Sequence, residues 1–100
     1  MDYTVIVDYI GFWDSPCEAH FFIRSEECAD VVAEKALLAL ICATSVQKIE
    51  SIEVKYFDED SGDWVYPYVN PIKDTAFYRS LRLTPPEIQM DIVIKERKKD

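Results

Sequence analysis

Apolar residues recur at every second position in several stretches of the chain, which is the periodicity of a β-strand. The clearest stretches are residues 2–10, residues 17–24 and residues 49–57. The short connection between the first two favours an antiparallel hairpin. A fourth stretch, residues 63–69, contains Pro67, which cannot donate a hydrogen bond to a neighbouring strand. We therefore expect this fourth strand to lie at an edge of the sheet or to be bulged.

The segment from Ser25 to Val46 follows a helical period instead. Ser25 is a suitable N-cap, and the acidic residues after it lie where the helix dipole favours negative charge. The helix is apolar on two opposite sides, with a main stripe suited to packing on a sheet and a sparser second seam. The stripe comprises Ala29, Val32, Ala33, Ala36, Leu37, Leu40 and Ala43, and the seam comprises Val31, Leu38 and Cys42.

Residues 70–84 carry the weakest pattern in the chain. Asp74 is placed to cap a short helix over residues 75–81, and a strand is the alternative. The two prolines that follow end either element. A final strand is expected next, and we expect the basic tail, residues 95–100, to fray beyond it. The alternating apolar residues of that strand are Ile88, Met90, Ile92 and Ile94.

The order of elements is therefore ββαββ, a short connecting element and a last strand. Strands in hairpin pairs together with one long helix predict an α+β fold. The expected architecture is a two-layer sandwich, in which an antiparallel sheet of about five strands carries the long helix across one face. A length of 100 residues fits a single domain, residues 1–100, and 49% hydrophobic residues indicate a globular chain.

The chain carries no pattern typical of export or membrane insertion. Its N-terminus lacks a basic region, and Asp8 interrupts the first apolar stretch. The longest apolar run, residues 36–43, has eight residues, whereas a transmembrane helix needs about 20. The three cysteines, Cys17, Cys28 and Cys42, follow no disulfide or metal-binding spacing. We therefore expect a cytoplasmic protein without a membrane partner.

The chain is strongly acidic, with 19 acidic and 11 basic residues and a net charge of −8. Residues 95–100 hold four of the bases and two of the acids, so residues 1–94 hold 17 acids against 7 bases and carry −10. Such a charge repels nucleic acid and anionic membranes and favours basic protein partners. The plainer interpretation is that an acidic surface keeps a small protein soluble.

No combination of side chains indicates catalysis, a metal site or a cofactor. His20 is the only histidine, and acidic neighbours in the sequence disfavour a reactive thiolate at Cys28. Cys17 and His20 are three positions apart on one expected strand and so face opposite sides of it. Two glycines exclude a glycine-rich phosphate loop, and the acidic turn at residues 58–63 has its glycine at the wrong position for an EF-hand. We expect a protein that is not an enzyme.

The acidic turn and the strand after it form the strongest candidate for a binding site. Acidic side chains would complement a basic partner, and Trp and Tyr are frequent anchors in protein interfaces. The aromatic residues equally fit the inward face of a half-buried strand, so core and interface are both open. The acidic members are Asp58, Glu59, Asp60 and Asp63, and the aromatic members are Trp64, Tyr66 and Tyr68.

These features favour a non-enzymatic protein-binding domain, an inhibitor that docks on a basic, nucleic-acid-binding surface of a partner protein. In size, charge and compactness the chain is similar to the small acidic inhibitors that phages encode, such as anti-CRISPR and DNA-mimic proteins, and no motif carries this likeness. One alternative is a homo-oligomeric structural or accessory subunit that pairs through Val31, Leu38 and Cys42, so monomer and homodimer are both open. A second alternative is a small enzyme or ligand carrier with a cavity between sheet and helix.

Overall fold

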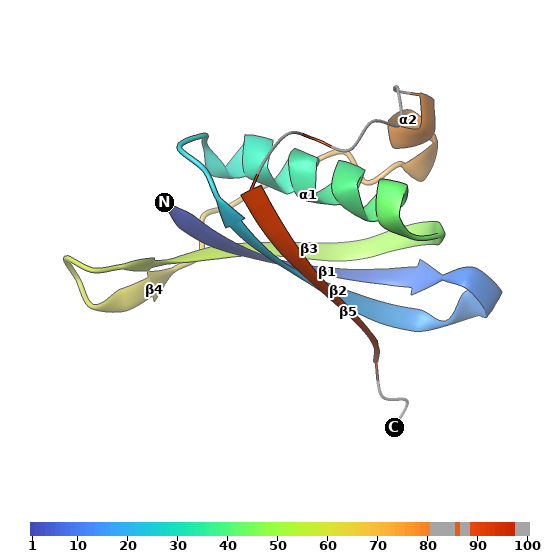
Figure 1. Cartoon of the computed structure of the whole chain (residues 1–100), viewed down its shortest axis with the longest axis horizontal. Coiled ribbons are helices and arrows are strands. Elements are labelled where there is room, and N and C mark those ends of the chain that lie inside the picture. The colour runs from blue at the N-terminus through green and yellow to red at the C-terminus, as the bar shows by residue number, and fades with distance from the viewer. Residues whose placement is uncertain (81–85, 87–88, 98–100) are drawn as a thin grey trace.

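The computed structural model describes residues 1–80, 86 and 89–97. A five-stranded antiparallel sheet carries helix α1 across one face (Figure 1), and its strand order is β4-β3-β1-β2-β5. The elements are β1 (Asp2–Gly11), the 3-10 helix η1 (Phe12–Asp14), β2 (Pro16–Arg24), α1 (Ala29–Ala43), β3 (Val46–Asp58), β4 (Asp63–Val65), α2 (Thr75–Ser80) and β5 (Gln89–Glu96). The predicted α+β sandwich is confirmed.

The core lies between α1 and one face of the sheet, to which β1, β2 and β3 all contribute. Its sheet side is formed by Tyr3, Val5, Val7, Tyr9, Ala19, Phe21, Ile23, Val46, Ile49 and Val54, and its helix side by Val32, Ala33, Ala36, Leu37, Ala39 and Leu40. Most of the predicted helix stripe is therefore buried. The two ends of that stripe differ from the prediction, because Ala29 is half-buried and Ala43 is exposed.

Helix α1 is shorter at both ends than the predicted helix from Ser25 to Val46. The Ser25 hydroxyl accepts a hydrogen bond from Glu27 N at 3.0 Å, so this residue forms a local turn and does not cap the helix. Cys28 occupies the N-cap position without a side-chain hydrogen bond. At the other end, Val46 already pairs with Gly11 in the sheet, so the helix has ended before it.

Strands β3 and β4 differ in length from their predicted stretches. β3 starts at Val46 and continues through two irregularities of register opposite β1, so it is longer than predicted. β4 ends at Val65, whereas we predicted a strand as far as residue 69. Pro67 accounts for the early end, because it has no N–H to donate to β3. The predicted edge position of this strand is confirmed.

The short helix predicted over residues 75–81 is present as α2, and Leu81 lies outside the described residues. Asp74 caps it, because its Oδ1 accepts a hydrogen bond from Ala76 N at 2.9 Å. Tyr78 anchors α2 in the core and is 2% exposed. Burial raises the pKa of Tyr78 to about 12.

The last strand reaches past the predicted start of the frayed tail. Lys95 and Glu96 belong to β5 rather than to a frayed tail. Arg97 N donates a hydrogen bond to Pro16 O at 2.9 Å, and its guanidinium donates one to Tyr9 O at 3.2 Å. These bonds tie the end of β5 to the neighbouring strands. Residues 98–100 and residue 88 of the predicted final strand lie outside the described part of the chain.

Candidate protein-binding surface

The hairpin formed by β3 and β4 projects from one end of the sheet (Figure 1). We call its residues 56–65 the acidic hairpin. Pairing of β3 with β1 ends where Tyr56 lies opposite Tyr3, so the rest of the acidic hairpin extends past the start of β1. Asp58 builds the turn, because its carboxylate accepts hydrogen bonds from Asp60 N and Ser61 Oγ, each at 3.1 Å. The tip of the hairpin is therefore a folded turn.

The four predicted acidic residues have two different roles in this hairpin. Asp58 is half-buried, and its carboxylate is hydrogen-bonded within the turn. Asp63 Oδ1 accepts a hydrogen bond from Trp64 N at 2.9 Å. Glu59 and Asp60 are exposed at the tip, and no side-chain hydrogen bond of either one is found among the described residues. Glu59 and Asp60 are therefore the carboxylates best placed to meet a partner.

The three predicted aromatic residues lie at the surface rather than in the core. Trp64, Tyr66 and Tyr68 are 46%, 58% and 86% exposed. Only Trp64 belongs to β4, because the strand ends before the two tyrosines. The indole of Trp64 packs edge-on against Phe57 with ring centroids 5.6 Å apart, and Lys55 Nζ lies 5.0 Å from its ring centroid. Trp64 is thus exposed but held in place by two neighbours.

The sheet face opposite α1 carries further aromatic residues. No element within the described ranges packs over this face, and we call it the open face. Phe22 on β2 is 48% exposed there, and Phe57 on β3 is 47% exposed. Phe22 lies opposite Thr4 in the β1–β2 ladder, and Phe57 lies opposite Trp64. The aromatic surface of the acidic hairpin therefore continues onto the open face of the sheet.

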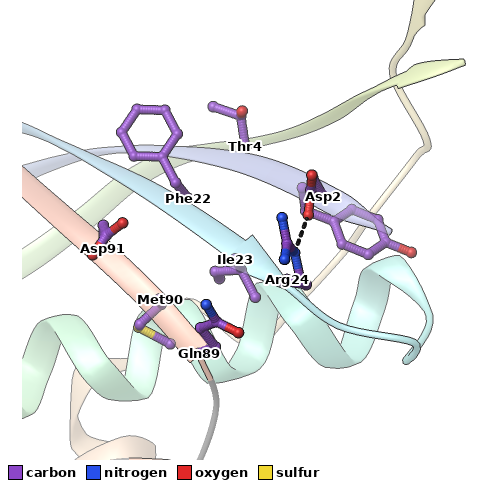
Figure 2. Close-up of a pocket in the computed structure, with 9 residues that line it drawn as sticks. Asp2, Thr4, Phe22, Ile23, Arg24, Gln89, Met90 and Asp91 are labelled. Atoms are coloured by element: carbon purple, nitrogen blue, oxygen red, sulfur yellow. Dashed lines mark hydrogen bonds and ion pairs between the residues drawn. The ribbon is translucent and has the colours of Figure 1, made fainter. Parts of the chain in front are cut away.

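Two adjoining hollows run across the open face and share Asp2, Thr4 and Arg24. The first, of about 340 Å³, crosses β1, β2 and β5, and its further lining residues include Phe22 and Asp91. Figure 2 shows Phe22 and Thr4 pointing away from α1. The second, of about 660 Å³, reaches the acidic hairpin. Its other lining residues are Met1, Glu26, Phe57, Glu59 and Trp64. We call the two hollows together the sheet groove.

An ion pair divides the two halves of the sheet groove. Arg24 Nε donates to Asp2 Oδ1 at 2.9 Å (Figure 2). This hydrogen bond and the charge of Arg24 hold the pKa of Asp2 below its usual range, and the same pair raises the pKa of Arg24. The charges of Asp2 and Arg24 offset one another, and the N-terminal ammonium of Met1 offsets Glu26, whose Oε1 lies 3.4 Å away. Glu59 and Asp91 therefore give the groove its acidic character.

A second charged cluster lies at the other end of the open face. Glu18 contacts His20 through Nε2 and lies 3.6 Å from Lys95 Nζ. The hydrogen bond from His20 lowers the pKa of Glu18 more than burial raises it, and the charges of His20 and Lys95 act in the same direction. The Arg97 guanidinium pairs with Glu50 nearby. These contacts satisfy charges within the sheet, so we regard this cluster as structural.

The geometry offers no catalytic dyad between His20 and Cys28. His20 belongs to the residues of β2 that face away from α1, whereas Cys28 immediately precedes α1 on the other side of the sheet. Cys17, Cys28 and Cys42 are free thiols. In the ranges that the structure describes, no three ligating side chains gather as a metal site. The helices within those ranges are also too short or too polar to cross a bilayer.

The three residues of the second seam of α1 border two separate hollows. Val31 and Leu38 border a shallow hollow of about 240 Å³ together with Phe77 and Tyr78 of α2. Cys42 borders a different apolar hollow of about 220 Å³, beside β5. All three seam residues are half-buried. The structure therefore brings only two of them together, and α2 lies against that pair.

Sequence reasoning missed the contribution of Phe22 and Phe57 to this surface. Both lie on the polar side of their strands, and the alternation along each strand does indicate that side. Their common surface depends on β1 lying between β2 and β3, which no local pattern shows. Phe12 and Trp13 at the β1–β2 turn are 60% and 82% exposed. Exposed aromatic residues therefore mark both ends of the sheet.

No protein family model, curated protein or solved structure matches this chain. The chemistry of its surfaces is therefore the basis for assigning a function.

Proposed function

We propose that this chain is a non-enzymatic protein-binding domain that docks on a basic surface of a partner protein. The observation that carries this proposal is the shared position of Glu59 and Trp64, which line the same hollow of the sheet groove. An exposed carboxylate and a restrained aromatic ring therefore face the same hollow. The carboxylate steers a basic partner, and the ring anchors it.

The charge of the whole chain supports the same partner chemistry. Residues 1–94 carry −10, so the acidic hairpin and the groove lie within a strongly negative field. Such a field accelerates the encounter with a basic surface and makes association sensitive to salt. Many basic protein surfaces bind nucleic acid, so we propose that the domain acts in the cytoplasm as an inhibitor that occupies such a surface. This role would resemble that of acidic inhibitors encoded by phages.

The fixed position of Trp64 also supports a binding role. Its contacts with Phe57 and Lys55 restrict the indole before any partner arrives, so little side-chain entropy is lost on binding. Phe57 and Phe22 extend the apolar contact area along the sheet groove. Pairing through the helix seam is the less favoured alternative, because Cys42 lies apart from Val31 and Leu38.

A charge-reversed hairpin tests this proposal. Glu59→Lys combined with Asp60→Lys removes the two exposed carboxylates of the tip and leaves the turn bonds of Asp58 in place. Affinity capture from a lysate of the cells that naturally contain this protein should lose the wild-type partner when this variant is the bait. Capture by the wild-type chain should also weaken as salt concentration rises.

The matched control changes charge by the same amount elsewhere. Asp30→Lys combined with Glu34→Lys alters two exposed residues of α1. This control should retain the partner, because neither residue lies in the acidic hairpin. Equal capture by both variants and the wild-type chain would refute a hairpin-directed interface. Equal loss from both variants would show that only overall charge matters, which also contradicts the proposal.

A further inference from the structure

Strand β5 forms the edge of the sheet opposite the acidic hairpin. Within the described part of the chain it pairs on one side only, with β2. Three consecutive apolar residues at its centre are exposed: Ile92 by 36%, Val93 by 53% and Ile94 by 42%. The N–H and C=O groups along the outer side of such a strand offer a template for another strand. β5 is therefore a candidate surface for strand pairing.

Sheet edges usually carry features that prevent such pairing, and β5 has few of them. Prolines, bulges, very short strands and charged side chains are the common protections, and β5 carries only the last of these, at Asp91, Lys95 and Glu96. β5 is eight residues long and contains no proline. Its register with β2 is uninterrupted from Gln89 opposite Arg24 to Glu96 opposite Cys17. A regular strand of this length presents its backbone groups in an order that a second strand can match.

The sequence of β5 is complementary to itself in one antiparallel register. With Val93 opposite the partner's Val93, a second copy places its Ile94 opposite Ile92 on the side of α1. On the open face the same register places the partner's Lys95 opposite Asp91. Lys95 lies 3.6 Å from Glu18 of its own sheet but is 60% exposed, so it lies between two carboxylates in the pair. Because the arrangement has two-fold symmetry, each of the last two pairs occurs twice. Opposite charges and large apolar side chains directly across an antiparallel pair are both stabilising.

Neighbouring registers lack this match. A centre on Ile92 places Asp91 opposite the partner's Val93 and leaves no opposite-charge pair among the residues of β5. A centre on Ile94 also leaves no opposite-charge pair among the residues of β5, and it places Glu96 opposite the partner's Ile92. The register centred on Val93 places Glu96 opposite the partner's Met90, at the end of the paired segment. If the two-fold axis instead lay between two residues, each residue would be opposite one whose side chain points to the other face of the sheet. The pleat of a sheet disfavours such a pairing. The register centred on Val93 is therefore the favoured one.

The helix side of β5 provides apolar surface for the same partner. Met90 and Ile92 border an apolar hollow of about 220 Å³ with Cys42 and Ala43 of α1 and with Pro86. The main contacts of α1 with the sheet are to β1, β2 and β3, and Met90 packs only partly against the core, so α1 covers β5 less than it covers the other three strands. In the register centred on Val93, the partner's Ile94 lies beside Ile92 and next to this hollow. Pairing would therefore bury apolar side chains in addition to joining backbone groups.

We infer that two copies of this chain pair antiparallel through β5 and form one continuous ten-stranded sheet. The interface is separate from the acidic hairpin, which lies at the opposite edge of each sheet. The dimer would display one acidic hairpin at each far end. Two binding sites on one particle strengthen attachment to a partner that itself carries repeated or paired basic surfaces.

Sedimentation of the 100-residue chain at increasing concentration provides the first measurement. The wild-type chain should approach twice the 11.6 kDa mass of one chain. In a dimer of the Asp91→Lys variant, the lysine at position 91 faces Lys95 of the other copy at both charge pairs. In a dimer of the Lys95→Asp variant, the aspartate at position 95 faces Asp91 of the other copy at both pairs. Each single variant should dimerise at least about tenfold more weakly than the wild-type chain, since like charges directly opposite are destabilising.

Mixing the two variants makes the test specific. A mixed dimer of the Asp91→Lys and Lys95→Asp chains has opposite charges at both pairs, so an equimolar mixture should regain the dimer that each chain alone loses. Circular dichroism and thermal melting should show that both variants fold. Glu34→Lys, which makes the same charge change on α1, should dimerise like the wild-type chain.

Three outcomes would overturn the inference. The first is a wild-type mass of one chain at every concentration. The second is a mixture that dimerises no better than the separate variants. The third is loss of the dimer in Leu38→Glu without loss in Asp91→Lys, which would place the interface on the helix seam instead. Glu59→Lys with Asp60→Lys should leave the dimer unchanged, so the hairpin proposal and this inference fail separately.

Discussion

The two edge strands of the sheet differ in length and in the side chains they expose. The β4 edge holds a strand of only three residues, an acidic turn before it and Pro67 soon after it. The β5 edge holds a regular strand of eight residues with three exposed apolar residues at its centre. A short strand with charges and proline resists pairing with another strand, whereas a long, regular and apolar strand favours it.

This difference shows that the two edges present different chemistry to a partner. The β4 edge presents side chains, namely the exposed carboxylates of Glu59 and Asp60 and the ring of Trp64. The β5 edge presents backbone groups, with side chains that select the register. Side-chain recognition suits a foreign surface of opposite charge. Backbone recognition suits a second strand. One small domain thereby has room for two independent interfaces.

The largest effect on the free energy of unfolding is expected from a substitution in the core, because both edges of the sheet require the folded domain. Leu37 is completely buried in α1 beneath the sheet. Leu37→Ala should lower the free energy of unfolding by about 2–5 kcal/mol, because it removes apolar contacts and leaves a cavity. Chemical denaturation measures this loss. The neighbouring half-buried Leu38 is the matched control, and Leu38→Ala should cost less. Equal costs would contradict the assignment of the main stripe to the core.

A smaller effect on stability is expected at the β4 edge. Trp64→Ala removes the edge-on contact with Phe57 and the cation–π contact with Lys55, and should cost about 1 kcal/mol of unfolding free energy. The same variant should lose capture of the partner while its self-association through β5 is retained. Trp64→Phe preserves an aromatic ring and should keep part of the capture. A Trp64→Ala chain that captures the partner at wild-type level would remove Trp64 from the interface.

The smallest effect on stability is expected from a change at Glu18, which lies on β2 opposite Lys95 of β5. The pKa of Glu18 is lowered from 4.5, chiefly by the hydrogen bond from His20. A carboxylate with a lowered pKa stabilises the fold above its unfolded pKa, and this contribution is lost as pH falls through the lowered value. Glu18→Gln should therefore melt at a lower temperature than the wild-type chain near neutral pH. The difference should disappear in acid, and a pH-independent difference would exclude this explanation.

Much of the fold was predictable because its signals are local. The alternation along β1 and β2 identified the face that packs on α1, and the spacing of Val32, Ala36 and Leu40 identified the matching helix face. The ends of elements were less predictable, because several residues compete for the same backbone groups. Ser25 makes a turn bond with Glu27 instead of a helix cap. β4 stops before Pro67, although the alternation continues past it.

The candidate site was predictable only in part. The acidic and aromatic residues of the hairpin are consecutive, so the sequence identified them as a group. Their individual roles depend on short-range geometry, as in the turn bonds that occupy Asp58. The sheet groove depends on contacts between distant segments, since Phe22 and Phe57 reach one face only because β1 separates their strands. The self-complementarity of β5 is visible in the sequence, but its relevance depends on β5 being an edge.

Hydrogen–deuterium exchange of the 100-residue chain at low and high concentration tests most directly whether the two edges have separate roles. The backbone amides of Gln89–Glu96 should become more protected as concentration rises, because pairing with a second copy covers the outer side of β5. The amides of Asp63–Val65 should exchange at the same rate at both concentrations. Exchange in β5 that does not depend on concentration, or equal protection of both edges, would contradict this account.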